Sequence, residues 1–263
     1  MSDTALQFPA GARMRRSDGE ANGPNETEIV RIRRRQNRAL DTRQKIITAA
    51  LAEFADRGFA GASTRAVAAA AGVQHPLVNY HFQSKEGLWR AVLAETVGHF
   101  MQQFRARLAG LRGVDDVTKL RLVQEDFVRF AAQNPHFHLL MSQEARRSSK
   151  RLNWLVKEFV RPYFTEVTAL IRSAQHAGRY AEGDPVHLQY LFIGATTRIF
   201  SLAAEVKQIA GASPFTPAML EQHVAACLGL FFRPPSEAAS AGDRGTGGNR
   251  PRPSGVRKTR TRM

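Results

Sequence analysis

The chain has 263 residues, 43% of them hydrophobic, and a formal net charge of +15. This length accommodates one large domain or two modest ones, and this apolar content is enough for a core. No apolar stretch approaches the ~20 residues that cross a bilayer, no signal-peptide pattern begins the sequence, and the single cysteine, Cys227, excludes an intramolecular disulfide. We expect a cytoplasmic protein with no membrane partner, no metal site and no cofactor.

The positive charge is concentrated toward the two ends of the chain. Residues 1–40 carry a net charge of +3, residues 41–232 of +6 and residues 233–263 of +6. Arginine clusters that flank a folded unit favour a polyanionic partner, either nucleic acid or an anionic membrane surface, and charge alone does not choose between them. Composition predicts a disordered basic arm over residues 1–38 and a disordered basic tail over residues 234–263.

Between these ends the apolar residues recur with helical spacing, and no alternating polar and apolar run predicts a sheet. Helix boundaries follow from N-cap residues, first-turn prolines and terminating glycines. Asp41 with Gln44 forms a capping box, and Gly58 and Gly72 end the first two helices. The amino-terminal part is predicted to hold helices over residues 41–58, 63–72, 76–82 and 84–108.

The carboxy-terminal part shows the same signals over longer helices. An N-cap residue followed directly by proline opens three of them, at Asn134, Asp184 and Thr216. A helix is expected from residue 115 or 116 through Phe130, followed by helices over residues 134–144, 149–177, 184–209 and 216–233. The sequence therefore predicts an all-α fold of about nine helices.

Residues 63–82 have the spacing of a helix-turn-helix, with two short helices joined at Gly72 and Val73. The alanines at 68–71 let the helices approach closely, Gly72 supplies a positive φ angle, and Val73 fills the space between the helices. The second helix can then enter a DNA major groove, which is about 12 Å wide.

Four blocks over nearly fifty residues carry a resemblance: Thr42-Arg43-Gln44-Lys45-Ile46-Ile47-x-Ala49-Ala50, Phe54-x-x-x-Gly58-Phe59, Val67-Ala68-x-x-Ala71-Gly72-Val73 and Asn79-Tyr80-His81-Phe82-x-Ser84-Lys85-x-x-Leu88. In these blocks the chain resembles the TetR family of bacterial regulators. It departs from the family pattern at Asn79, where an aromatic residue is common, and at Pro76, where a small residue or glycine is common. The resemblance implies a helix-turn-helix DNA-binding domain over residues 39–86 and an all-α ligand-binding and dimerisation domain over residues 87–233.

The resemblance also implies which residues meet DNA. Arg65, His75, Pro76 and Asn79 match positions that reach base edges, and Asn79 and Arg65 suit adenine and guanine respectively. The other matched positions lie along the phosphates or beside the recognition helix, and they are Thr42, Arg43, Ser63, Thr64, Gln74, Leu77, Tyr80, His81 and Lys85.

Several of these residues have a simpler interpretation that the sequence leaves open. Ser63 can be only an N-cap, Tyr80 can pack against the first helix, and Lys85 can be merely solvated. The arginine run before the first helix can enter the minor groove, track phosphates or remain solvated, and it comprises Arg31, Arg33, Arg34, Arg35 and Arg38.

In the second domain, the resemblance implies a dimer built by the last two helices and a pocket between the middle helices. The expected pocket walls are Phe127, Phe130, Phe137, Met141, Phe164 and Phe192, with Glu144, His138 or Arg198 as polar contacts. A stripe of this kind is also compatible with a plain core.

The sequence thus predicts a sequence-specific DNA-binding regulator that is not an enzyme. The favoured form is a ligand-responsive homodimeric repressor, and its partners are a palindromic double-stranded operator, a second copy of the chain and an unknown small-molecule effector. The alternatives are an activator, a nonspecific nucleic-acid-binding protein, and an enzyme or small-molecule binder whose amino-terminal helices serve only as scaffold.

Overall fold

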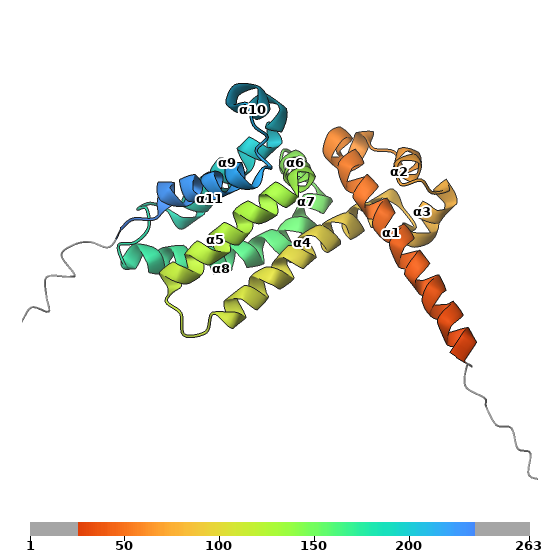
Figure 1. Ribbon diagram of the computed structural model, residues 1–263, viewed down its shortest axis with the longest axis horizontal. Helices are drawn as coiled ribbons and strands as arrows, with labels where there is room; N and C mark the ends of the chain where they lie inside the picture. The colour runs from red at the N-terminus through yellow and green to blue at the C-terminus, as the bar shows by residue number, and fades with distance from the viewer. Residues whose placement is uncertain (1–25, 235–263) are drawn as a thin grey trace, which may run out of the picture.

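The computed structural model describes residues 26–234, which form two groups of helices joined by one long helix (Figure 1). The first group consists of α1 (Glu26–Gly61), α2 (Thr64–Ala70) and α3 (His75–Phe82), and α4 (Lys85–Gly110) runs from it into the second group. The second group contains α5 (Asp116–Gln133), α6 (Pro135–Glu144), α7 (Lys150–Leu155), the π-helical segment η1 (Val156–Val160), α8 (Arg161–His176), α9 (Pro185–Ser201), α10 (Ala203–Ala210) and α11 (Pro217–Phe231).

The all-α class is confirmed. Within residues 26–234, extended pairing is confined to an isolated antiparallel bridge between Tyr180 and Phe232, which ties the loop after α8 to the end of α11. None of the helices in that range combines the length and apolar character that a membrane span requires.

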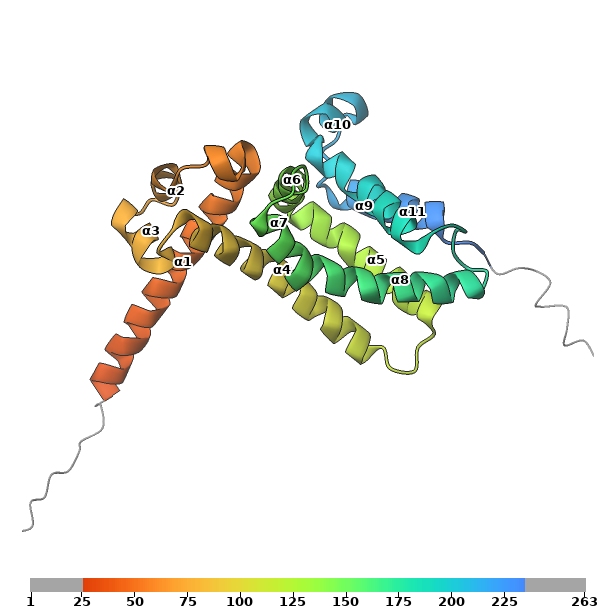
Figure 2. The same cartoon turned by 180° about the vertical axis from the view of Figure 1, so that it is seen from behind.

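Helix α1 begins well before the predicted start at Asp41. Residues 26–38 were expected to be disordered, but in the structure they form the first part of α1. Asp41 therefore lies inside the helix and does not cap it. Arginine, glutamine and leucine are good helix formers, so helical propensity extends α1 where no apolar stripe exists. The amino-terminal half of α1 projects away from the other helices (Figures 1 and 2). Residues 1–25 and 235–263, which hold the rest of the predicted arm and nearly all of the predicted tail, lie outside the described residues.

Two predicted helices are divided in the structure. The helix expected over residues 149–177 contains a π-helical segment at Val156–Val160, and the helix expected over residues 184–209 is interrupted at Leu202. The predicted N-caps at Ser84, Asp115 and Asp184 are confirmed by side-chain bonds to the first turn, whereas Asn134 and Thr216 make no such bond. Proline fixes φ at those helix starts and lacks an N–H that would need a partner.

One continuous hydrophobic core runs through both groups of helices. In the first group, Ile46, Phe54 and Val67 pack with Leu88 and Trp89 of α4. Farther along α4, Phe100 lies 4.5 Å from Phe130 of α5 and 5.5 Å from Tyr163 of α8, between ring centroids. Helix α4 therefore contributes to the cores on both sides of the junction.

Helix α1 is broken at Gly58, as the sequence predicts, with φ of 66° and ψ of 172°. This conformation is essentially restricted to glycine. A Cβ atom at Gly58 would also lie 2.8 Å from Oε1 of Gln143 on α6. Gly58 thus allows the end of α1 to turn while α6 packs directly against it.

We expect Gly58→Ala to lower the free energy of unfolding by about 1–3 kcal/mol, because the backbone is strained and Gln143 must move. Chemical denaturation measures this change. Gly98→Ala in α4 is the matched control, since a Cβ there meets no atom within 4 Å. The control should leave stability unchanged or raise it by up to about 1 kcal/mol. Equal effects of the two substitutions would contradict the assignment.

Candidate DNA-binding surface and its link to the second domain

The turn between α2 and α3 is the predicted helix-turn-helix turn. Gly72 has a φ angle of 65°, and the Val73 N–H donates to the Ala68 carbonyl oxygen at 3.0 Å. Val67 and Ala68 of α2 are buried together with Val78 of α3. The small residues therefore let the two helices cross closely, as the sequence indicates.

The amino-terminal ends of α2 and α3 are joined by a side-chain hydrogen bond. Oγ1 of Thr64, the first residue of α2, lies 3.0 Å from Nε2 of His75, the first residue of α3. Both residues are half-buried. The bond fixes the position of two residues from the predicted DNA-contacting set relative to each other.

Most of the predicted DNA-contacting residues on or beside α2 and α3 are exposed to solvent. Of the predicted set, the exposed residues on or beside α2 and α3 are Ser63, Arg65, Gln74, Pro76, Leu77, Asn79 and Tyr80. The Tyr80 side chain is 79% exposed, so it does not pack against α1, whereas Phe82 is buried in the core. His81 is half-buried, with its ring 5.3 Å from that of Tyr80 between centroids.

Three other predicted contact residues have side-chain partners inside the protein, and Ser63 has a backbone partner. Arg43 forms an ion pair with Glu95 of α4 at 2.6 Å, and Thr42 bonds to the Arg38 carbonyl oxygen. Lys85 donates to the Ala60 carbonyl oxygen at 3.1 Å. The Ser63 N–H donates to Glu53, and the Ser63 side chain makes no capping bond to α2. Of these side chains, only that of Ser63 is free of a described internal bond.

The six predicted pocket residues lie in the hydrophobic core or pack against it. Phe127, Phe130, Phe137 and Phe192 are buried, with Phe127 6.0 Å from Phe192 and Phe130 5.5 Å from Phe137 between ring centroids. Met141 and Phe164 are half-buried at the edge of the core. A surface hollow of about 480 Å³ between α4 and α5 includes only Phe130 from this set. The aromatic stripe is thus packed core.

The three predicted polar contacts have separate environments. Arg198 is exposed, and Glu144 is buried in an ion pair with Arg151. His138 is buried among Phe127, Phe130 and Phe137, and its Nε2 atom has no hydrogen-bond partner. Burial lowers the pKa of His138 to about 4. The imidazole is therefore neutral near pH 7.

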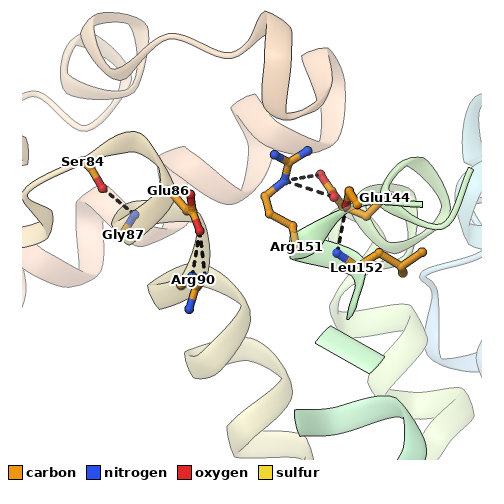
Figure 3. Close-up of polar contacts among 8 residues, drawn as sticks. Ser84, Glu86, Gly87, Arg90, Glu144, Arg151 and Leu152 are labelled. Carbon is orange, nitrogen blue, oxygen red and sulfur yellow. Dashed lines mark hydrogen bonds and ion pairs between the residues drawn. The ribbon is translucent and has the colours of Figure 1, made fainter. Parts of the chain in front are cut away.

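Residues of α6 and α7 contact the end of α1, and Figure 3 shows two of them, Glu144 and Arg151, paired with each other. The Arg151 Nε atom lies 3.2 Å from a Glu144 carboxylate oxygen, and the Arg151 guanidinium lies 3.8 Å from the centre of the Phe59 ring. The Gln143 side-chain amide donates to the Ala55 carbonyl oxygen. These contacts define an interdomain clamp, made by Gln143, Glu144 and Arg151 on the last turns of α1. The sequence did not predict the clamp, because Gln143 and its partner Ala55 are 88 residues apart and belong to no motif.

Helix α3 is joined tightly to α4. Ser84 Oγ accepts a hydrogen bond from the Gly87 N–H at 2.9 Å (Figure 3). A Cβ atom at Gly87 would lie within 2.2 Å of the Phe82 carbonyl oxygen, so only glycine lets α4 begin directly against the end of α3. A tilt of α4 would therefore carry α3 with it.

Comparisons with known proteins match this arrangement. The family model for "Bacterial regulatory proteins, tetR family" matches residues 46–92. The HTH-type transcriptional regulator RutR of Escherichia coli (strain K12) is 28% identical over 189 residues, which cover 70% of this chain and 86% of RutR. The HTH-type transcriptional regulator CymR of Pseudomonas putida is 36% identical over 90 residues, which cover 34% of this chain and 44% of CymR.

Solved structures share the fold. AibR, in complex with isovaleryl coenzyme A and operator DNA, matches with a TM-score of 0.58 at 18% identity, covering 72% of this chain and 97% of that one. HlyIIR, a hemolysin II transcriptional regulator, matches with a TM-score of 0.54 at 18% identity over the same shares of each chain. Both likenesses extend across the two groups of helices.

Acid should destabilise the protein through His138. Its folded pKa of about 4 lies below the ordinary value of 6.5, so the unfolded chain binds more protons between these values. The free energy of unfolding should fall by about 3 kcal/mol from this group as the pH drops from 6.5 to 4, with no contribution above pH 6.5. Denaturant unfolding at fixed protein concentration across this range measures the slope.

His138→Gln should reduce that slope, because the replacement does not titrate. The exposed His176 is the matched control, and His176→Gln should leave the slope unchanged. An unaltered slope in His138→Gln would show that other groups cause the acid sensitivity.

Proposed function

We propose, on the premise that this chain belongs to the TetR family of transcriptional regulators, that it is a ligand-responsive homodimeric repressor that binds a palindromic operator. The observation that carries the proposal is the open face of α3, where Asn79 and the 79% exposed Tyr80 face solvent from a helix that is otherwise anchored by Val78 and Phe82. A protruding, rigidly anchored short helix fits the DNA major groove.

Two residues on this face carry the sequence reading in the proposal. Asn79 can accept from and donate to an adenine edge, and Arg65 can donate two bonds to a guanine edge. Thr64 and His75, joined to each other, stay beside these residues and contact the backbone or an adjacent base. Arg43 and Lys85 bind phosphates by sharing or exchanging their internal partners.

The helical extension of α1 adds electrostatic attraction to DNA. Its exposed arginines are Arg31, Arg33, Arg34, Arg35 and Arg38. Because these arginines lie on a helix, their charges are held at fixed spacing. Each DNA phosphate that they neutralise releases counterions, which favours binding. We assign to this extension the phosphates that flank the operator.

Dimerisation is supported by large apolar side chains that are mostly exposed in the described chain. Tyr190 and Leu191 of α9 are 59% and 62% exposed, and Leu230 of α11 is 70% exposed. Helices α9 and α11 pack side by side, so these residues lie on neighbouring helices. In the proposal they pair with the same helices of a second copy across a twofold axis. The two copies of α3 would then lie roughly 34 Å apart, which selects a palindromic site.

Ligand response is supported by the path of α4. At one end α4 begins against α3 through Ser84 and Gly87, and at the other its Phe100 and Phe104 pack on α5 and α8. A ligand that alters the packing of the second group of helices can therefore tilt α4 and change the distance between the α3 helices of the two copies. The relative AibR was solved with both an acyl coenzyme A and operator DNA, which supports the same pairing of functions.

Selection of bound sequences from random DNA tests the operator assignment. The wild-type protein should enrich a palindromic site. Asn79→Ala and Arg65→Ala should each weaken binding to that site by about 1–3 kcal/mol and relax the preference at one base pair of each half-site. Gln208→Ala, at an exposed position on α10, is the control and should retain the site. Equal binding of the wild type to all sequences would favour a nonspecific nucleic-acid-binding protein instead.

Leu230→Glu should convert the dimer into a monomer, because it buries a carboxylate in the proposed interface. Light scattering coupled to size-exclusion chromatography measures the mass in solution. Leu40→Glu is the control, since Leu40 is 63% exposed on α1, away from α9 and α11. A wild-type monomer, or a Leu230→Glu dimer, would exclude the interface.

A further inference from the structure

A surface hollow of about 450 Å³ lies between α4 and the continuous helix formed by η1 and α8. Figure 2 shows α4 and α8 side by side there, and their Phe104 and Tyr163 rings are 5.2 Å apart between centroids. Small-molecule sites typically measure ~300–1,000 Å³, so the hollow can hold a ligand. Its α4 side is a stripe of Met101, Phe104 and Leu108, three or four residues apart on one helix face. This apolar stripe is about 10 Å long.

The rim of the hollow carries positive charge. Arg105 of α4, Lys157 of η1 and Arg161 of α8 line it, and all three side chains are exposed. Among the described residues of the lining, Glu166 supplies the carboxylate, so the net charge there is +2. Within residues 26–234, none of the three cations forms an ion pair. Their charge is therefore available to an anion.

The backbone beside the hollow departs from a regular α-helix. At the end of the π-helical segment Val156–Val160, the Arg161 N–H donates to the Val156 carbonyl oxygen, five residues earlier. Pro162 follows, and it has no N–H with which to continue the α-helical pattern. Lys157 lies within this segment and Arg161 directly after it, and both line the hollow. Isolated π-turns are frequent at functional sites, so this irregularity supports a binding role for the hollow.

The lining selects the chemistry of a ligand. The stripe on α4 offers no side-chain hydrogen bond, so it favours an alkyl chain over a sugar or a base, whose polar groups would lose their hydration without compensation. The cations attract an acid group and repel an amine. Because the cations are exposed, an anion can reach them without being fully desolvated. A flexible chain that ends in a carboxylate satisfies both parts of the lining.

We propose that this hollow binds a free fatty carboxylate, with the alkyl chain along Met101, Phe104 and Leu108 and the acid group at Lys157 and Arg161. The site is on the surface, outside the aromatic core, and none of its lining residues belongs to α3, α9 or α11. It is therefore independent of the proposed operator contacts and of the proposed dimer interface. A ligand held there contacts α4 and α8 at once.

Calorimetric titration of the full-length protein with decanoate, below its micelle concentration, tests the chemistry. Acetate has the same acid group without the chain, and decyltrimethylammonium has the same chain with the opposite charge. We expect saturable binding of decanoate and at least tenfold weaker binding of the other two. Octanoate should bind about threefold or more weakly than decanoate, since each buried methylene strengthens binding by up to about fourfold. Equal binding of acetate or of decyltrimethylammonium would overturn the assignment.

Two double variants locate the site. Lys157→Gln with Arg161→Gln should weaken decanoate binding at least tenfold and leave the melting temperature unchanged, because both side chains are exposed and unpaired. Arg146→Gln with Lys207→Gln is the matched control, since it removes the same charge from exposed positions outside the hollow. The control should retain the wild-type affinity. Unchanged affinity in the first variant, or an equal loss in the control, would place the bound decanoate elsewhere.

An anionic membrane presents a similar combination of acid groups and acyl chains. Cosedimentation with phosphatidylglycerol vesicles distinguishes it from a free ligand. The variant with Lys157→Gln and Arg161→Gln should bind these vesicles as the wild type does, because the hollow holds a single free chain in the proposal. Loss of vesicle binding in that variant, with decanoate affinity unchanged, would assign the hollow to a membrane and overturn the proposal.

Discussion

The position of the face proposed to read DNA depends on how the end of α1 is held against α6 and α7. Arg151 is central to this contact, because its guanidinium bonds to the buried Glu144 carboxylate and also covers the Phe59 ring of α1. Removing the guanidinium would leave a buried carboxylate without a counter-charge, which is far more costly than losing an exposed ion pair. The clamp therefore sets one end of the geometry between the two groups of helices, and α4 sets the other.

The clamp and α4 together restrict how the two groups of helices can move relative to each other. Helix α4 enters both cores, so it can tilt only if aromatic contacts at Phe100 and Phe104 rearrange. The clamp holds α1, which shares its core with α2 and α3. A tilt of α4 therefore either rotates the first group of helices about the clamp or breaks the clamp. Packed interfaces of this kind switch between discrete arrangements more readily than they deform continuously.

Local signals in the sequence predicted local structure well. The turn at Gly72, the break at Gly58 and the caps at Ser84 and Asp184 follow from residue chemistry within a few positions, and the structure contains all four. Burial of Val78 and Phe82 beside exposed Asn79 and Tyr80 on α3 is likewise a local property of the helix. The DNA contacts of this face were expected from the family resemblance and stay a prediction.

Long-range and propensity-driven features were missed. The extension of α1 over residues 26–40 lacks an apolar stripe, so periodicity could not detect it. The clamp joins residues far apart in sequence. The aromatic stripe proposed as a pocket was real as a pattern, but periodicity cannot distinguish a core from a cavity.

The π-helical segment at Val156–Val160 was not predicted from the sequence either, and it changes the direction in which the side chains on its two sides point. Trp154 and Tyr163 are nine positions apart, which in an uninterrupted α-helix, at about 100° per residue, places them about 180° apart. A π-turn absorbs one extra residue and reduces that angle to about 80°, so both rings can contact α4, at Trp89 and at Phe104. A single surplus residue thus sets the rotational phase between α7, which carries the clamp residue Arg151, and α8, which carries Tyr163.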